Sequence, residues 1–422
     1  MIDTKKTLKQ DLVEPVTHSK KMDDSKIRYY VIFFCVSVTA IGFVLFNEVY
    51  LDHKFYLLDW QAITQGKNAW ENSTNAYGPT HNGLVILHYF HVKLPWLFYV
   101  ILWLITCGVT SNFLIRNQAI DKRQKLLLHL CIFFNPLLWF FVVEGGGNDM
   151  LMAFFVILSF YLYRKNEDFF SGVSMAIAIG VKFLPIVAVP FLIFSRKKIR
   201  WKYTYALILS LVLFFGISYF LWGEQNLNPF QYAMERRSKI LSGFRFLRGC
   251  YSPLLLFSDK PNIDWLSTWM IGASITSFFY FHIRYQLENI LSAIIALGLV
   301  VLLFKVGHHQ FFITFITSLL FWISSNDKNY LNVKKRVFSF NLFFSMIATV
   351  SIIFRLKNSP VTEYFGQFFP HYFYNNIIGL PVSLITALIL FHLIQYSLSI
   401  RKSNVSDVVE GNSKDPQNLV NT

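Results

Sequence analysis

The chain has 422 residues and a formal net charge of +15, and 54% of its residues are hydrophobic whereas only 15% are charged. Soluble domains carry about 25% charged residues, and a soluble core could not bury this much apolar surface. The composition excludes an ordinary water-soluble protein and predicts an all-α polytopic membrane protein whose solvent is hydrocarbon.

Residues 1–28 form the first predicted segment, which precedes every apolar run. They mix lysines with aspartates and glutamates and contain no small-residue cleavage site of the signal-peptide type. We therefore expect a retained cytoplasmic tail at residues 1–28, followed by a transmembrane domain at residues 29–400.

Long apolar runs fill that domain. They lie at residues 29–46, 95–115, 126–143, 150–163, 203–222, 265–281, 287–304, 311–323, 337–354 and 377–400. A further apolar stretch at residues 169–194 is interrupted by Gly180, Lys182 and Pro185, which predicts a hairpin of two short helices. Together these segments predict about twelve membrane segments.

The distribution of lysine and arginine predicts the orientation of the segments. Basic residues concentrate around residues 116–125, 164–165, 196–200 and 328–336, and loops of this kind are retained in the cytoplasm. We expect a multi-pass plasma-membrane protein with both termini cytoplasmic and a disordered tail at residues 401–422. The predicted outer loops are residues 47–94, 144–149, 223–264, 305–310 and 355–376.

Three acidic residues of the first outer loop, Glu48, Asp52 and Asp59, follow soon after the first apolar run. A carboxylate at the outer face could deprotonate a hydroxyl as a general base or bind a metal ion. Scattered acids in an ordinary solvated loop explain the spacing equally well. Asp52 and Asp59 are the candidate catalytic residues.

The second outer loop combines Glu144, three glycines, Asn148 and Asp149. Glycine lets the backbone approach a ligand closely, and it also supplies the positive φ angles of a tight turn. The structural turn is the favoured interpretation, with Glu144, Asn148 and Asp149 as candidate substrate-binding residues. The lysine and the strand–helix context of a phosphate-binding loop are absent from this motif.

Lys182 lies within the interrupted apolar stretch. A cation at bilayer depth costs about 2.5–3.5 kcal/mol on insertion scales, so this lysine predicts a functional site for an anionic ligand. The alternative is that its side chain extends to the membrane interface.

Two later outer loops carry further candidates. Basic and apolar residues alternate in the loop at 223–264, which predicts an amphipathic helix that binds lipid phosphate, although simple attraction to anionic headgroups is an equal alternative. Its candidate phosphate-binding residues are Arg236, Arg237, Arg245 and Arg248. In the loop at 305–310, adjacent histidines point in different directions on a helix, so we interpret His309 and Gln310 as sugar-binding groups rather than metal ligands.

The order of these motifs resembles the GT-C superfamily of integral membrane glycosyltransferases, and within it the polyprenol-phosphate-mannose-dependent mannosyltransferases. The matching residues are Asp52 and Tyr56 in a D-x-x-x-Y motif, Gly66, Tyr77-Gly78-Pro79, Asn135-Pro136, Lys182 and Pro185 in a K-x-x-P motif, and His309 to Phe311. The resemblance covers residues from about 29 to 323. Members of that family often have Gly-Gln and Pro-Pro where this chain has GGGND and Gly-Pro, so sugar and acceptor specificity do not carry over.

The resemblance implies inverting transfer of a hexose such as mannose from a polyprenyl-phosphate donor to a glycolipid or glycan acceptor. Asp52 is the implied base and Asp59 its rival, while Lys182 and the loop arginines would stabilise the leaving phosphate. Tyr56, Trp60 and Tyr77 would contact the sugars. We expect no cofactor, and a divalent metal ion stays an open alternative.

Two other functions fit an apolar chain with these motifs. A transporter or flippase of a lipid-linked sugar would need ionisable residues along a path at the membrane midplane, whereas nearly all of those described above lie in outer loops, which favours an enzyme. A polysaccharide ligase or polymerase is the third interpretation. The bilayer and the lipid-linked substrates are the expected partners, and nucleic acid is not.

Overall fold

The structure, a computed structural model, describes residues 24–49, 52–70, 77–118, 120–195, 198–229, 263–304, 309–325 and 380–413, with isolated positions at 231, 339, 341, 342 and 345. Residues 232–262 of the third outer loop, most of the apolar run at 337–354 and the loop at 355–376 lie outside the described residues. The described part is almost entirely helical, and its strands, β1 (Phe194–Ser195) and β2 (Lys198–Ile199), form a short antiparallel pair.

Five helical stretches are long and apolar enough to cross a bilayer, which takes about 20 residues. They lie in α1 (Asp24–Phe46), in α5 (Leu94–Arg116), in α6 (Lys122–Phe133) with α7 (Pro136–Leu138) and the π-helical turn η1 (Trp139–Glu144), in α11 (Trp201–Trp222) with η3 (Gly223–Leu227), and in α19 (Leu380–Ser413). The predicted helical class and the presence of spanning helices agree with this structure. The count of about twelve segments stays a prediction.

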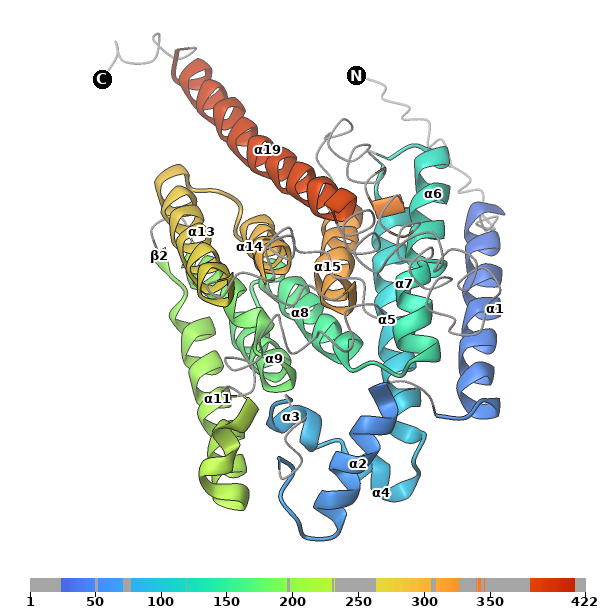
Figure 1. Cartoon of the computed structure of the whole chain (residues 1–422). Coiled ribbons are helices and arrows are strands. Elements are labelled where there is room, and N and C mark those ends of the chain that lie inside the picture. The colour runs from blue at the N-terminus through green and yellow to red at the C-terminus, as the bar shows by residue number, and fades with distance from the viewer. Residues whose placement is uncertain are drawn as a thin grey trace, which may run out of the picture.

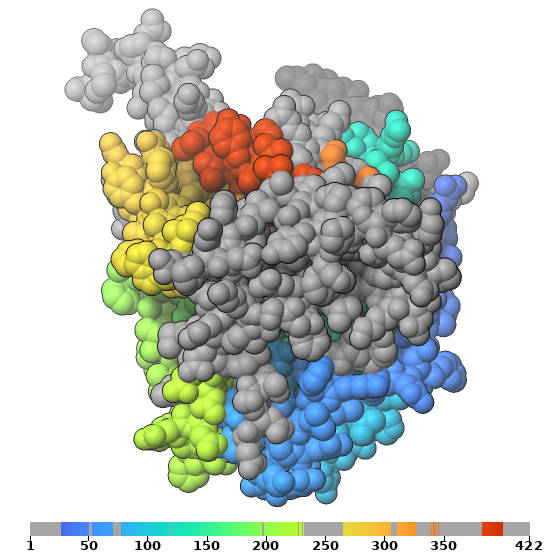
Figure 2. Space-filling view, viewed as in Figure 1, coloured from blue at the N-terminus to red at the C-terminus, as the bar shows by residue number. Residues whose placement is uncertain are grey.

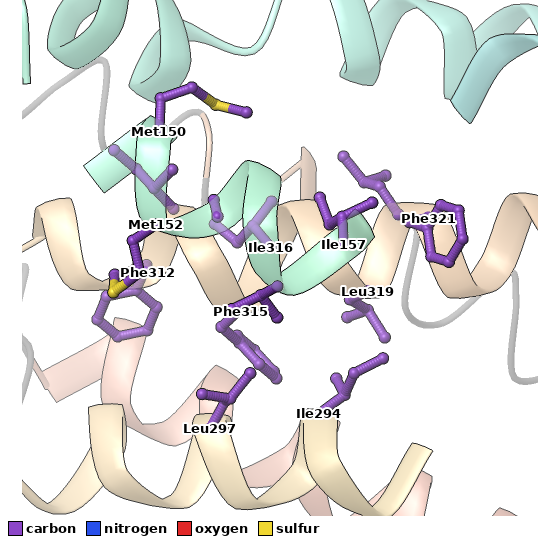
Figure 3. Packing of buried hydrophobic residues seen from close by; sticks show 14 of the residues in the cluster. Met150, Met152, Ile157, Ile294, Leu297, Phe312, Phe315, Ile316, Leu319 and Phe321 are labelled. Carbon is purple, nitrogen blue, oxygen red and sulfur yellow. The ribbon is translucent and has the colours of Figure 1, made fainter. Parts of the chain in front are cut away.

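Four shorter apolar helices form the centre of the molecule. They are α8 (Asp149–Arg164), α9 (Asp168–Val181), α14 (Asn289–Leu303) and α15 (Phe312–Ser325). In Figure 3, Ile157 of α8 and Leu297 of α14 lie on either side of Ile316 and Phe315 of α15. Because Gly298 has no Cβ, α14 accommodates Phe315, whose ring would lie 2.7 Å from a Cβ at that position. These packed helices form the core next to which the candidate site lies.

Outside this centre, α11 and α13 (Ile263–Tyr285) expose large apolar side chains. Among them, Val212 is 64% exposed and Trp265 is 65% exposed. Such faces are expected to contact lipid tails, since hydrocarbon solvates them at no cost.

The helix is interrupted after α9, as predicted from Gly180, Lys182 and Pro185. α9 ends at Val181, and Lys182 is extended with φ −148° and ψ 145°. A 3₁₀ turn, η2 (Leu184–Ala188), and α10 (Val189–Ile193) follow. Pro185 lacks a backbone N–H, and in a continuous α-helix its ring would clash with the carbonyl of Val181 four residues earlier, which explains why α9 does not continue.

The predicted first outer loop is a compact helical segment. Its helices α2 (Asp52–Thr64), α3 (Pro79–Asn82) and α4 (Val85–Phe90) gather at one end of the molecule, and α19 crosses the opposite end (Figure 1). The Gly78 N–H donates to the Val181 carbonyl over 3.0 Å, and the Lys93 ammonium donates to the Leu45 carbonyl over 2.8 Å. In Figure 2 this segment and the end of α11 lie side by side. It is therefore joined directly to the ends of α1 and α9.

The C-terminal end of α8 is anchored by hydrogen bonds and an ion pair of Arg164. Arg164 donates to the carbonyl and hydroxyl of Ser325, and its guanidinium lies 3.6 Å from the Glu288 carboxylate. The Trp322 indole N–H donates to the same carboxylate over 3.1 Å. These contacts join α8 to α14 and α15 away from the α2–α4 segment.

The last helix extends further than the apolar run predicts. α19 continues from Leu380 to Ser413, so residues 401–413, predicted as part of a disordered tail, are helical in the structure. Adding residues to an existing helix costs far less than starting one, and this segment contains no proline, so a polar sequence can prolong the apolar helix.

We expect Gly78→Ala to destabilise the protein, because a Cβ at Gly78 would lie 2.4 Å from the Gly180 carbonyl oxygen. Overpacking of this kind costs about 1–3 kcal/mol. The measurement is the thermal unfolding midpoint of the purified protein in detergent. The matched control is Gly272→Ala in α13, where nothing lies within 4 Å of the new Cβ. A midpoint lowered equally in both variants would contradict the proposed close packing.

Candidate active site

Within the described residues, predicted site residues come from four separate parts of the chain. They meet where the α2–α4 segment contacts the glycine-rich turn before α8, the break after α9 and the start of α15 at η6 (His309–Phe311). Two groups of contacts define the site: an ion pair between Lys182 and Asp149, and a hydrogen-bonded chain through Tyr56, Asn148 and His81.

Lys182 and Asp149 form a buried ion pair. The Lys182 ammonium lies 2.7 Å from Asp149 Oδ1, and the exposed fractions of the two side chains are 12% and 2%. The rings of Tyr77 and Phe311 flank the ammonium at 5.2 Å and 5.8 Å, distances at which an aromatic face attracts a cation. Lys182 therefore turns toward the protein interior and does not extend away to an interface.

A hydrogen-bonded chain lies beside this pair. The Tyr56 hydroxyl donates to Asn148 Oδ1 over 3.2 Å, and Asn148 Nδ2 lies 3.0 Å from His81 Nδ1. All three side chains are fully buried. The ring of Tyr77 lies 4.5 Å from that of His81, so Tyr77 contacts both groups of residues.

The glycine-rich turn brings Asn148 and Asp149 to this place. Gly146 has a φ of +59°, in the left-handed region that favours glycine, and a Cβ there would lie 3.0 Å from the side chain of His53. The Gly147 N–H donates to the Phe141 carbonyl at the end of the π-helical turn. The turn interpretation is thus confirmed, and the turn also positions two candidate site residues. π-Helical turns often occur at functional sites.

Tryptophans hold the α2–α4 segment together from inside. Trp60 is fully buried, its indole N–H donates to the His81 carbonyl, and its ring lies between 5.2 Å and 5.8 Å from the rings of His53, His81 and His88. The Trp70 indole N–H donates to the Tyr77 carbonyl. Trp60 thus packs as part of the scaffold, and its faces are occupied by protein rings.

The two candidate bases lie on the same helix. Asp52 is the first residue of α2, one turn before Tyr56, and its side chain lies outside the described part. Asp59 is only 4% exposed and makes no salt bridge within the described part of the chain. Burial raises the pKa of Asp59 to about 7, so this carboxyl group keeps its proton to a higher pH than an aspartate in water does.

Burial also keeps the nearby histidines neutral. It lowers the pKa of His53 to about 4, and it lowers the pKa of His81 well below its usual value, with further contributions from the positive charge of Lys182 and from His53. At neutral pH, Lys182 is therefore the cation among the described side chains that meet at this point.

The remaining predicted residues are less closely connected to the site. Glu144 is half-buried at the end of η1, and Gln310 is half-buried beside Phe311. His309 belongs to η6, but its side chain lies outside the described part, as do Arg236, Arg237, Arg245 and Arg248. Among the described residues, no three His, Cys, Asp or Glu side chains form a group that could hold a metal ion.

Residues 77–305, just over half of the chain, match the family described as glycosyltransferase family 87. The chain belongs to this family. The matched region of the family 87 chain includes Tyr77, His81, Asn148, Asp149 and Lys182, and it leaves out α2. The predicted resemblance to membrane glycosyltransferases is thus confirmed, whereas the candidate bases lie outside the matched region.

The family 87 chain is also similar to a yeast protein named GPI mannosyltransferase 1, from Saccharomyces cerevisiae (strain ATCC 204508 / S288c). The two are 26% identical over 171 residues, which is 37% of this chain and 41% of the yeast protein. The chain therefore spans less than half of that relative. The similarity supports a membrane glycosyltransferase that resembles mannosyltransferases.

Sequence reasoning missed His53 and His81 in this family 87 site. A usable signal was present, because four of the eleven histidines lie in the first outer loop, at positions 53, 81, 88 and 91. The spacing could not show that His53 and His81, 28 positions apart, both pack against the ring of Trp60.

We expect Asp59→Asn to stabilise the family 87 protein increasingly as the pH rises. The carboxyl group binds its proton more tightly in the folded state, at a pKa of about 7 against a reference value of 3.8. Raising the pH between these values therefore destabilises the wild type, by about 1.4 kcal/mol for each pH unit. Asparagine cannot ionise, so the stability of the variant does not fall with pH in this way.

The measurement is the difference in thermal unfolding midpoint between variant and wild type at pH 5 and at pH 8. This difference should grow with pH for Asp59→Asn. The control is Glu48→Gln, which removes an exposed acid shortly before α2. The same difference at both pH values for Asp59→Asn would show that this carboxyl group ionises normally.

Proposed function

We propose that the chain transfers a hexose, mannose or a similar sugar, from a polyprenyl-phosphate donor to a glycolipid or glycan acceptor at the outer face of the plasma membrane. Membership of a glycosyltransferase family establishes the broad reaction class. The donor, the face of the membrane and the catalytic base are the parts that we propose.

One observation carries this proposal: a lysine and polar side chains from distant parts of an apolar chain meet beside the first outer segment. Lys182 contacts Asp149 and the ring of Tyr77, while Tyr56 of α2 contacts Asn148, the neighbour of Asp149. Burying such groups is costly unless they have partners. Their accumulation at the end of the helices supports a binding site for a charged, lipid-linked molecule.

In the proposed reaction, Asp52 accepts the proton of the acceptor hydroxyl. The acceptor oxygen forms a bond to the anomeric carbon of the sugar with inversion, and the bond from that carbon to the phosphate oxygen breaks. Polyprenyl phosphate leaves with the bonding electron pair. We rank Asp52 above Asp59 because Asp52 precedes the site residue Tyr56 by one turn of α2, whereas Asp59 is buried.

The leaving phosphate would be stabilised by Lys182. An ammonium group has three N–H donors, so the contact with Asp149 leaves donors for a phosphate oxygen. Asp149 would keep the unliganded lysine neutralised and correctly oriented. Arg236, Arg237, Arg245 and Arg248 would add positive charge from the third outer loop as the phosphate leaves.

The proposed orientation follows from charge. Basic loops favour the cytoplasm, which would leave the α2–α4 segment outside and both termini in the cytoplasm. The opposite positions of α19 and α2–α4 in Figure 1 support this arrangement. Membership of the transferase family favours an enzyme over a transporter or flippase.

We expect Asp52→Asn to lose transfer activity by roughly 10²- to 10⁴-fold, the usual contribution of a general base. Activity would be measured as transfer of radiolabelled sugar from a panel of polyprenyl-phosphate sugars to native membrane extract. The control is Glu48→Gln, which removes an exposed acid of the same segment. Full activity in Asp52→Asn with loss in Asp59→Asn would assign the base to Asp59, and full activity in both would refute the mechanism.

We expect Lys182→Ala to raise the donor KM roughly 10- to 100-fold through loss of a charged hydrogen-bond donor. Lys54→Ala, at an exposed position of α2, should leave the donor KM unchanged. Because Lys182→Ala also leaves Asp149 buried without its partner, the double variant Lys182→Met with Asp149→Leu separates the two effects. It should recover stability without recovering donor affinity, and an unchanged KM in Lys182→Ala would remove this lysine from the phosphate site.

A further inference from the structure

His81 has a hydrogen-bonding group that the proposed mechanism does not use. Its ring is fully buried in α3, where Nδ1 faces Asn148 Nδ2 at 3.0 Å. Its other nitrogen, Nε2, is buried and has no hydrogen-bond partner within the described part of the chain. Buried polar groups are nearly always paired, so a group of this kind calls for an explanation.

The hydrogen bonds of Asn148 determine which nitrogen of His81 carries the proton. The Asn148 backbone N–H is directed at the Tyr56 oxygen at 3.5 Å, so the hydroxyl hydrogen of Tyr56 is left to donate to Asn148 Oδ1. Since Oδ1 accepts from Tyr56, the amide group facing His81 is the donor Nδ2. His81 Nδ1 must then accept, and in a neutral ring Nε2 carries the hydrogen.

His81 is held neutral by its surroundings. Burial, the positive charge of Lys182 and the neighbouring His53 all lower its pKa. A neutral ring with its Nδ1 occupied can donate only through Nε2. The tyrosine–asparagine–histidine chain thus prepares one fixed, uncharged N–H donor.

The donor lies close to the proposed phosphate site. The ring of Tyr77 is 4.5 Å from the ring of His81, and the Lys182 ammonium is 5.2 Å from the same tyrosine ring. Lys182 has Asp149 as its counter-ion, so the pair carries no net charge. The His81 ring and the Lys182 ammonium therefore both lie against the ring of Tyr77.

We propose that His81 Nε2–H donates a hydrogen bond to a phosphate oxygen of the lipid-linked sugar donor. This inference rests on the proposed function, which assigns phosphate binding to Lys182. His81 would orient the phosphate through a directed hydrogen bond, and Lys182 would attract it through its positive charge. The phosphate would then be bound by two different groups. Tyr56 and Asn148 are then positioning residues, because they act by fixing the proton on Nε2.

Two substitutions at His81 separate this role from a structural one. In His81→Gln, the side-chain amide N–H replaces the Nε2–H donor, and the contact with Asn148 is lost. In His81→Asn, the side-chain oxygen can accept from Asn148 Nδ2 in place of Nδ1, and the distal donor is lost. The two variants are of similar polarity and each retains one of the two functions of the ring.

The test compares the donor KM and the thermal unfolding midpoint of both full-length variants with those of the wild type. We expect His81→Asn to raise the donor KM roughly 10- to 100-fold, as for loss of a hydrogen bond to a charged group, and His81→Gln to stay within a few-fold of the wild type. Equal KM values in the two variants, or a larger increase in His81→Gln, would overturn the inference and leave His81 a packing residue.

A second measurement follows ligand binding in the wild type. In wild-type protein with ¹⁵N-labelled histidine, the Nε2 resonance of His81 should shift on addition of polyprenyl phosphate and stay unchanged with polyprenol, which lacks the phosphate. An equal response to both lipids, or to neither, would overturn the phosphate assignment. The resonance would be assigned by its absence from His81→Gln.

These outcomes are separable from failure of the proposed function. If the wild type transfers sugar from a polyprenyl-phosphate donor but the two His81 variants have equal KM values, the inference alone fails. If the wild type transfers no sugar from any polyprenyl-phosphate donor, the proposed function fails, and the response of the Nε2 resonance to polyprenyl phosphate still decides whether His81 binds phosphate.

Discussion

The ion pair between Lys182 and Asp149 is the interaction on which this structure depends. In a chain with only 15% charged residues, a lysine inside an interrupted apolar stretch would be costly without a partner. Its 2.7 Å contact with Asp149 removes this cost and joins the break after α9 to the start of α8. Ion pairs of this type contribute little net stability against apolar replacements. Retaining one is therefore easier to understand as a feature of a binding site.

Charged side chains anchor α8 at both ends, and the Lys182–Asp149 pair is the anchor at its start. Asp149 begins α8 and Arg164 ends it, and Arg164 contacts Ser325 and Glu288 on other helices. Apolar packing between α8, α14 and α15 is non-directional, whereas these charged contacts have defined partners. Together they set the position of α8 along its axis, and with it the position of Asn148 and Asp149.

The α2–α4 segment completes the site because it is packed like a small core. Trp60 lies at its centre with three histidine rings around it, and Gly78 and Gly180 allow its backbone to approach the end of α9. Tyr56, Tyr77 and His81 are consequently held in place by close packing. Preorganised donors lose little freedom on binding, which suits the proposed stabilisation of a leaving phosphate.

The sequence by itself determined the solvent of this protein, the helical class, the break at Lys182 and the motif order that indicates a membrane glycosyltransferase. These depend on composition and on local patterns such as apolar run length, which act within a few turns of chain. Only the tertiary structure decided that Lys182 pairs with Asp149, that Trp60 is internal and that His81 joins the site. Contacts between residues 33 or 67 positions apart depend on how whole helices pack, and the long apolar runs that reveal the membrane carry little information about which faces meet.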